Sequence, residues 1–189
     1  MRLPLILAAA VLAYTAWEWS QQQASVSEII DQTVTDLNET VSDMTNSITG
    51  YTAAKVPEKY RAAIAASEAN HGLPDQMLAR LLWQESRYKD SVISGRVRSR
   101  VGALGIAQFM PATAADLGID PLDPYAAIDA AGRYLQSLYR QTGAWDQALA
   151  AYNWGIGNVK RKGLASAPTE TRNYFSQILA DIGLGGSYA

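Results

Sequence analysis

The sequence predicts a mainly α-helical protein: a helical domain preceded by an N-terminal hydrophobic helix and a heptad-repeat helix. Three observations support this. No alternation of apolar and polar residues, the pattern of a half-buried strand, persists along the chain. Prolines and glycines occur at spacings that open and close short helices. Apolar residues between positions 30 and 51 follow a heptad repeat. At 189 residues and 48% hydrophobic content, the chain suits one globular domain plus an extension.

The composition narrows the possible functions. Cysteine is absent and there is one histidine, which excludes disulfides and thiolate metal sites and makes a zinc site improbable. We therefore expect no metal and no cofactor. The net charge is −5 over residues 1–50 and +3 over the remainder, which suits a mildly basic domain that meets an anionic polymer, or ordinary surface variation. The basic stretches lack interleaved aromatic residues, so sequence-specific nucleic-acid binding is not expected.

Residues 1–20 form a hydrophobic segment. Leu3 to Trp17 is a run of 15 residues without a charge, and as a helix it would rise about 22 Å, against about 30 Å for a bilayer core. Trp17 and Trp19 flank Glu18 in the manner of an interfacial belt. We expect an uncleaved membrane anchor, with a cleaved signal peptide or a helix buried in protein as alternatives.

Residues 21–56 comprise a heptad-repeat helix and a linker, the linker being bracketed by Gly50 and Pro57. β-branched residues at a and mostly unbranched ones at d favour two parallel strands, so we expect a homo-oligomer; a single amphipathic helix folded onto the domain is the alternative. The seam consists of Ile30, Val34, Leu37, Val41, Met44, Ile48 and Tyr51.

Residues 57–189 read as a domain of six or seven short helices. His71 stands at the end of the first, where a helix-terminal cation is a more natural role than catalysis. In order, we expect helices from Pro57 to Asn70 with Gly72 as the stop, from Pro74-Asp75 onward, from Pro111 to near Gly118, from Asp123-Pro124 to before Gly143, over 146–153, and after Thr169 as an N-cap.

Glu85 belongs to the apolar face of the second of these helices. It follows Leu81 by four residues and Leu82 by three, and with Met77 and Leu78 these leucines form the buried stripe. Removing a carboxyl group from water raises its pKa, as a general acid near neutral pH requires. The alternative is a buried glutamate held in a salt bridge.

Three segments in order resemble the signature motifs of soluble lytic transglycosylases, lysozyme-like enzymes that cut the glycan strands of bacterial peptidoglycan. They are Glu85-Ser86, the stretch Gly105 to Thr113 that reads Gly-Ile-Ala-Gln-Phe-Met-Pro-Ala-Thr, and Ala151 to Gly155. The resemblance covers roughly residues 60–182. It implies a lysozyme-like fold with its small sheet reduced or lost, an SLT-type catalytic domain over 57–189, and peptidoglycan as the substrate.

The resemblance also implies a reaction with one catalytic residue. Glu85 would protonate the oxygen that links N-acetylmuramic acid (MurNAc) to N-acetylglucosamine (GlcNAc), and would then take the proton of the muramyl C6 hydroxyl as this closes onto C1. The product is a 1,6-anhydro-MurNAc end, and exclusion of water favours ring closure over hydrolysis.

The roles of the neighbouring residues follow from the same resemblance. Ser86 would hydrogen-bond near the reacting sugar, Gln108 would contact the N-acetyl group or Glu85, and Met110 would pack on a sugar face. Where the family usually has methionine, this chain has Ala107, which would remove a bulky group from the groove.

The third motif implies that the hydroxyl of Tyr152 touches Glu85 or the N-acetyl oxygen, while Asn153 either fixes the local backbone or binds ligand. Glu170 opens a segment that resembles the family's Glu-Thr-x-x-Tyr pattern, and it would bind substrate from across the groove. For Thr171 and Tyr174 we expect packing roles.

Two other functions remain open. A goose-type muramidase would hydrolyse the same bond, and Asp90 is the acid that follows Glu85 closely enough in sequence to activate water. Alternatively, the chain is a structural virion or ejection component with a passenger domain. For the enzyme, we expect local wall opening for phage DNA entry or for secretion machinery, either in a virion or at the inner membrane facing the periplasm.

The stretch between Ser86 and Gly102 is longer than in typical relatives and carries Arg96, Arg98 and Arg100 at alternate positions. It is either a solvated loop or a lip that meets peptide-stem carboxylates or wall phosphates.

Overall fold

The structure, a computed structural model, describes residues 30–34 and 50–185, and the chain divides into two compact units, residues 1–41 and 42–189. In the first unit, residues 30–34 are helical and exposed. The anchor predicted for residues 1–20 and most of the heptad seam lie outside the described residues. Within the described part of the chain, no helix has both the length and the apolar character needed to cross a bilayer.

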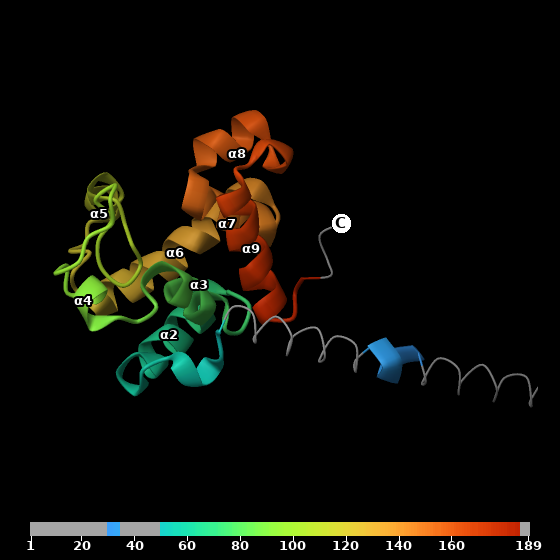
Figure 1. Cartoon of the computed structure of the whole chain (residues 1–189), viewed down its shortest axis with the longest axis horizontal. Coiled ribbons are helices and arrows are strands. Elements are labelled where there is room, and N and C mark those ends of the chain that lie inside the picture. The colour runs from blue at the N-terminus through green and yellow to red at the C-terminus, as the bar shows by residue number, and fades with distance from the viewer. Residues whose placement is uncertain (1–29, 35–49, 186–189) are drawn as a thin grey trace, which may run out of the picture. The chain divides into compact units, whose positions relative to one another are not determined.

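The second unit is helical, as predicted (Figure 1). Between residues 50 and 185 there is no strand; one antiparallel bridge joins Leu104 to Phe109. The elements are η1 (Ala53–Lys55), α2 (Glu58–His71), α3 (Met77–Ser86), α4 (Asp90–Ile93), α5 (Pro111–Leu117), α6 (Pro124–Thr142), α7 (Trp145–Trp154), α8 (Ile156–Lys162), η2 (Leu164–Ser166) and α9 (Thr169–Asp181).

Most helix ends lie where local chemistry predicts them. The expected stops at Gly72, Gly118 and Gly143 are all left-handed C-caps, and Asp123 accepts the first free backbone N–H groups of α6. Thr169 is the first residue of α9 rather than its N-cap. The short helices α4 and α8 had no clear sequence signal.

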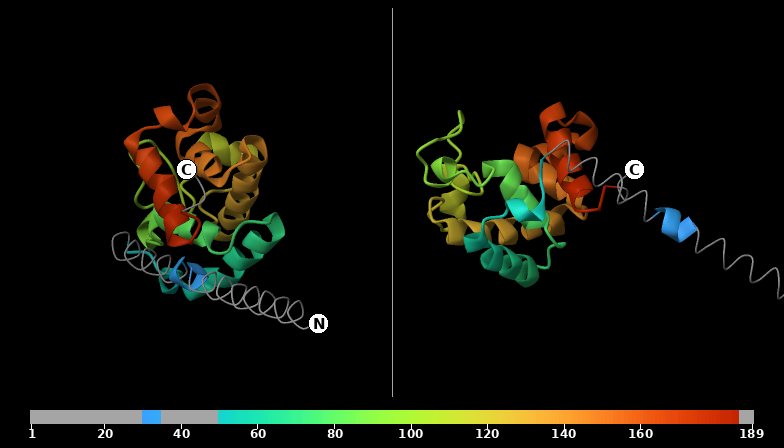
Figure 2. Two further views of the ribbon diagram at one scale, coloured as in Figure 1. Left: turned by 90° about the vertical axis from the view of Figure 1, so that its right-hand side faces the viewer. Right: turned by 60° about the horizontal axis from the view of Figure 1, so that its bottom comes forward.

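The core forms where helices distant in sequence pack together. The central helix α6 packs on α2 and α7, and α9 packs on α7 and α3; Figures 1 and 2 show α6 running between the part with α4 and α5 and the part with α7 to α9. A Cβ at Gly132 would lie 2.3 Å from the Ser67 hydroxyl, so a side chain there would have to displace this hydroxyl where α2 and α6 pack together. At the end of α2, His71 Nε2 lies 2.9 Å from Asp129 Oδ1 on α6.

Residues 51–56, predicted as part of a linker, instead belong to the packed domain. Tyr51 and Val56 are buried. The Tyr51 ring lies 6.2 Å from the Trp83 ring and 5.3 Å from the Arg80 guanidinium, measured between centres. The aromatic ring finds its partners on α3, which the heptad pattern alone does not indicate.

Candidate active site

Glu85 lies in the last turn of α3, directly before a sharp change in chain direction. Arg87 and Tyr88 both adopt left-handed backbone conformations, with φ of 51° and 52°. The Ser86 hydroxyl donates to the carbonyl of Leu82 at 3.0 Å and accepts the N–H of Tyr88 at 3.2 Å. Ser86 is therefore buried with its hydroxyl engaged inside the fold, where it holds the turn that presents Glu85.

The carboxyl group of Glu85 is half-buried and receives a hydrogen bond from another helix. The hydroxyl of Tyr174, on α9, donates to Glu85 Oε1 at 2.5 Å. Burial raises the pKa of Glu85 to about 7, and the hydrogen bond from Tyr174 acts in the opposite direction. Among the described residues Glu85 takes part in no salt bridge. The group is poised to hold or release a proton near neutral pH.

Tyr174 is the site residue that sequence reasoning missed, because we assigned it a packing role. Tyr174 is buried, and its pKa is raised well above the usual value. The main cause is burial, and the second is the nearby charge of Glu85. Tyr174 therefore remains a hydrogen-bond donor. Its place in the Glu-Thr-x-x-Tyr segment was the available signal, but only the packing of α9 on α3 brings the hydroxyl to Glu85.

Tyr152, on α7, ties this part of the site to the Gly105–Met110 segment. Its hydroxyl donates to the carbonyl of Ala107 at 3.0 Å rather than to Glu85, and its ring lies 5.9 Å from that of Phe109. Burial and then the charge of Glu85 raise the pKa of Tyr152. The side chain of Ala107 is completely buried, so at this position the chain supplies a backbone acceptor for Tyr152.

The Gly105–Met110 segment has a fixed backbone. Leu104 and Phe109 exchange N–H···O bonds of 3.0 and 3.1 Å. A Cβ at Gly105 would lie 1.8 Å from the carbonyl oxygen of Pro121, so only glycine fits. Gln108 has a φ of 49°, and its Nε2 donates to the carbonyl of Gly105 at 2.8 Å.

Of the remaining predicted residues, Asn153 lies where α7 meets α9, whereas Glu170 and Met110 are exposed. The hydroxyl of buried Thr171 donates to Asn153 Oδ1 at 2.8 Å, which links the two helices. Glu170 is exposed in the first turn of α9. Met110 is 42% exposed and precedes α5.

Asp90, the candidate for activating water, is engaged elsewhere. It begins α4, its side chain is 75% exposed, and its Oδ1 lies 3.3 Å from the ammonium group of Lys59. This arrangement is that of a solvated surface pair.

A buried ion pair joins the two helices that carry Glu85 and Tyr174. Arg80 Nε on α3 donates to Asp181 Oδ2 on α9 at 2.5 Å, and both side chains are 0% exposed. Arg80 Nη1 also donates to Gln84 Oε1 at 2.9 Å. The pair thus joins the same two helices as the contact between Tyr174 and Glu85.

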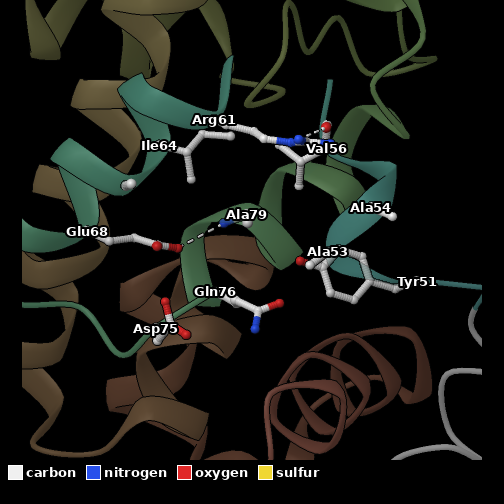
Figure 3. Close-up of a pocket in the computed structure, with 11 residues that line it drawn as sticks. Tyr51, Ala53, Ala54, Val56, Arg61, Ile64, Glu68, Asp75, Gln76 and Ala79 are labelled. Carbon is white, nitrogen blue, oxygen red and sulfur yellow. Dashed lines mark hydrogen bonds between the residues drawn. The ribbon is translucent and has the colours of Figure 1, made fainter. Parts of the chain in front are cut away.

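A cavity of about 500 Å³ lies toward the opposite end of α3, between η1 and α2 (Figure 3). Its walls include Tyr51, Arg61 and Glu68, whose Oε1 accepts the N–H groups of Leu78 and Ala79 at 2.9 and 3.1 Å. The reacting groups described above do not line it. Among the described residues, no three acidic or histidine side chains gather as metal ligands.

The family match to known proteins falls within the helical second unit. The profile of the transglycosylase SLT domain family matches residues 62–175. The chain is 31% identical over 144 residues to the peptidoglycan transglycosylase gp16 of Escherichia phage T7, which covers 66% of this chain and 10% of that protein. It is 30% identical over 122 residues to the transglycosylase of Enterobacteria phage PRD1, covering 64% of this chain and 42% of that protein.

Two solved structures share the fold. The Escherichia coli soluble lytic transglycosylase Slt70 superposes with a TM-score of 0.55 and 29% identity, over 65% of this chain and 23% of that one. An inactive mutant of lytic transglycosylase Slt from Pseudomonas aeruginosa gives 0.55 and 27%, over 67% and 24%. This chain thus spans less than half the length of each relative. Because the matching segment covers more than half of the chain and contains Glu85, the chain belongs to the transglycosylase SLT domain family, with the lysozyme-like fold of that family.

Proposed function

We propose that this chain is a peptidoglycan lytic transglycosylase that cleaves the β-1,4 bond between MurNAc and GlcNAc and leaves a 1,6-anhydro-MurNAc end. The observation that carries the proposal is the state of Glu85: half-buried, hydrogen-bonded by Tyr174, and with its pKa raised to about 7. Family membership and the names of the phage relatives support the same activity.

The proposed reaction passes one proton out of Glu85 and one proton into it. Protonated Glu85 donates to the glycosidic oxygen as the bond to muramyl C1 breaks, and the N-acetyl carbonyl oxygen stabilises the cation at C1. The Glu85 carboxylate then takes the proton of the C6 hydroxyl while the C6 oxygen forms a bond to C1. A pKa near neutrality suits both halves of the cycle, since the group must be a competent acid and then a competent base.

The surrounding residues position the sugar in this proposal. With its Nε2 engaged by Gly105, Gln108 has its Oε1 left to accept the N–H of the N-acetyl group. Exposed Met110 supplies an apolar contact for a sugar face, while Asn153 and Glu170 bind substrate beside α9. Tyr152 and Ser86 act indirectly, by holding the Ala107 carbonyl and the turn after Glu85.

Hydrolysis of the same bond by a goose-type muramidase is the rival outcome. It requires an acid that activates water, and the contact between Asp90 and Lys59 at the surface argues against that acid. In the Pseudomonas aeruginosa relative, a glutamate-to-glutamine mutant is described as inactive, which shows that one glutamate is essential in that protein.

We further propose that the enzyme opens the wall locally for a phage particle, held in place by residues 1–20 and oligomeric through the heptad-repeat helix that precedes the packed domain. The phage origin of both curated relatives and the sequence patterns of these segments support this setting. Particles that carry Glu85→Gln should assemble normally and fail to cut the wall. Loss of assembly on deletion of residues 57–189, with Glu85→Gln particles still infective, would favour a structural component.

The product test separates the two reactions. Purified murein is digested with the full chain, and the released fragments are weighed by mass spectrometry. We expect ends lighter by one water than reducing ends, and none from the Glu85→Gln protein. Reducing ends in place of anhydro ends would contradict the proposal and favour hydrolysis.

A further inference from the structure

Residues 96–101, called the arginine lip from here on, form a cationic and apolar projection. The side chains of Arg96, Arg98 and Arg100 are exposed. Val97 and Val101 between and beside them are 53% and 73% exposed. In the described part of the chain, none of the three guanidinium groups makes a hydrogen bond or an ion pair. Like charges without a counter-ion and two exposed valines together indicate a surface that another molecule covers.

The backbone of the arginine lip is held in place. The N–H of Val97 donates to the carbonyl of Ser91 at 2.8 Å. At the other end, the N–H of Ala103 donates to the Ser99 hydroxyl at 2.8 Å, and the N–H of Gly102 donates to the Ser99 carbonyl at 3.0 Å. The three arginines are thus displayed from a formed turn, which lowers the entropy lost when they bind.

The lip is joined at both ends to segments of the candidate site. It follows α4, which begins five residues after Glu85, and it runs directly into the Leu104–Phe109 hairpin that carries Gln108. Arg100 is five residues from Gly105, at most about 18 Å along an extended chain. A glycan bound at the hairpin would therefore bring its substituents within reach of the lip.

We propose that the arginine lip binds the carboxylates of the short peptide stems that hang from the glycan strand, with Val97 and Val101 against the alkyl parts of the stem. This rests on the proposed function, since the glycan must occupy the site for its stems to reach the lip. A stem of four residues spans about 13 Å when extended, a length comparable to the distance of at most about 18 Å between the hairpin and Arg100. The guanidinium fork pairs with carboxylates in two parallel hydrogen bonds. The lip lacks the aromatic residues of a nucleic-acid platform.

Two triple variants, each of which removes three positive charges, test this proposal. One is Arg96→Gln/Arg98→Gln/Arg100→Gln. The control is Lys160→Gln/Arg161→Gln/Lys162→Gln, which alters a basic cluster on α8 that is also exposed. Each is assayed on intact sacculi and on glycan strands from which an amidase has removed the stems. We expect the lip variant to lose roughly five- to tenfold in kcat/KM on stem-bearing murein, because it removes three solvent-exposed ion pairs, each of which contributes only weakly. On stripped strands it should lie within about twofold of the wild type.

A binding measurement tests stem recognition by the arginine lip independently of the proposed reaction. Co-sedimentation of Glu85→Gln protein with sacculi, with and without the lip substitutions, measures recognition in the absence of turnover. Weaker binding only where stems are present supports the lip. Equal loss on both substrates, equal loss in the α8 control, or no loss would overturn it. Lip-dependent binding to phosphatidylglycerol vesicles with unchanged murein binding would overturn it in favour of a membrane surface. Wild-type protein that forms no anhydro ends would refute the reaction while leaving this binding test intact.

Discussion

A glutamate carboxyl group that is partly or fully shielded from water lies at each end of α3, and the two groups have different partners. Glu68, on α2, is buried and accepts two backbone N–H bonds at the N-terminal end of α3. Glu85 is half-buried in the last turn of the same helix and accepts the hydroxyl of Tyr174. Burial raises the pKa of both groups. The backbone bonds at Glu68 oppose that rise, and the positive end of the helix dipole favours its anion.

The difference shows that the partners of a carboxyl group decide its role. Glu68 satisfies free N–H groups of the kind that every helix N-terminus presents, so its carboxyl group stabilises α3. Glu85 lies near the negative end of the same dipole and has one neutral donor, so its proton is retained near neutral pH. Residue type alone does not separate the two.

The largest effect should come from making the same substitution at each end of α3. Glu85→Gln removes the titrating proton, and general acid–base catalysis contributes about 10²–10⁴-fold, so murein cleavage should fall about a thousandfold. Glu68→Gln keeps an oxygen that can accept from Leu78 and Ala79, and cleavage should stay within about tenfold. Initial rates on sacculi measure both. Similar losses at the two positions would show that the two glutamates do not differ in role.

The second effect concerns the ion pair that joins the two helices of the Tyr174–Glu85 contact. Arg80→Met leaves the charge of Asp181 buried without Arg80 and should lower the free energy of unfolding by about 3–4 kcal/mol. The double variant Arg80→Met/Asp181→Leu should recover most of this loss, because no charge stays buried. Urea denaturation checks both proteins. A single variant as stable as the wild type would show that the pair does not hold α9 on α3.

Sequence reasoning succeeded where the cause was local. Gly143 ends α6 because glycine tolerates the left-handed conformation, and the spacing of Glu85 from Leu81 and Leu82 placed it on the apolar face of its helix. It failed where the cause was tertiary. The partners of Tyr174, Tyr51 and Arg80 lie on other elements, and no pattern along the chain indicates which helix packs on which.

The third effect is the pH dependence of stability at Glu85. A folded-state pKa of about 7 against 4.5 means that the native state holds this proton more tightly than the unfolded chain does. The contribution is fully present below pH 4.5 and is lost as the pH rises through 7. Glu85→Gln should therefore match the wild type at pH 4 and exceed it above pH 7 by about 2 kcal/mol, a value reduced for partial exposure. Thermal unfolding at pH 4 and pH 8 measures the difference, and a constant difference across this range would contradict it.

The smallest effect should follow Tyr174→Phe. The hydrogen bond from Tyr174 lowers the pKa of Glu85, so its loss should move the alkaline limb of kcat/KM upward by roughly one pH unit. Activity at pH 6 should change less than that at pH 8. Tyr125→Phe, at an exposed tyrosine whose hydroxyl donates to the Lys59 carbonyl, is the matched control and should leave the limb unmoved. An unchanged limb in Tyr174→Phe would mean that the contact does not tune the acid.

We infer that Glu85 keeps its proton near neutral pH, whereas Glu68 acts through the helix backbone. Titration of the side-chain carboxyl carbons by ¹³C NMR measures this directly, with Glu85→Gln and Glu68→Gln proteins used to assign the two signals. We expect the Glu85 signal to titrate at about pH 7 and its titration midpoint to rise in Tyr174→Phe. A Glu85 signal that titrates near 4.5, the ordinary value, would contradict it.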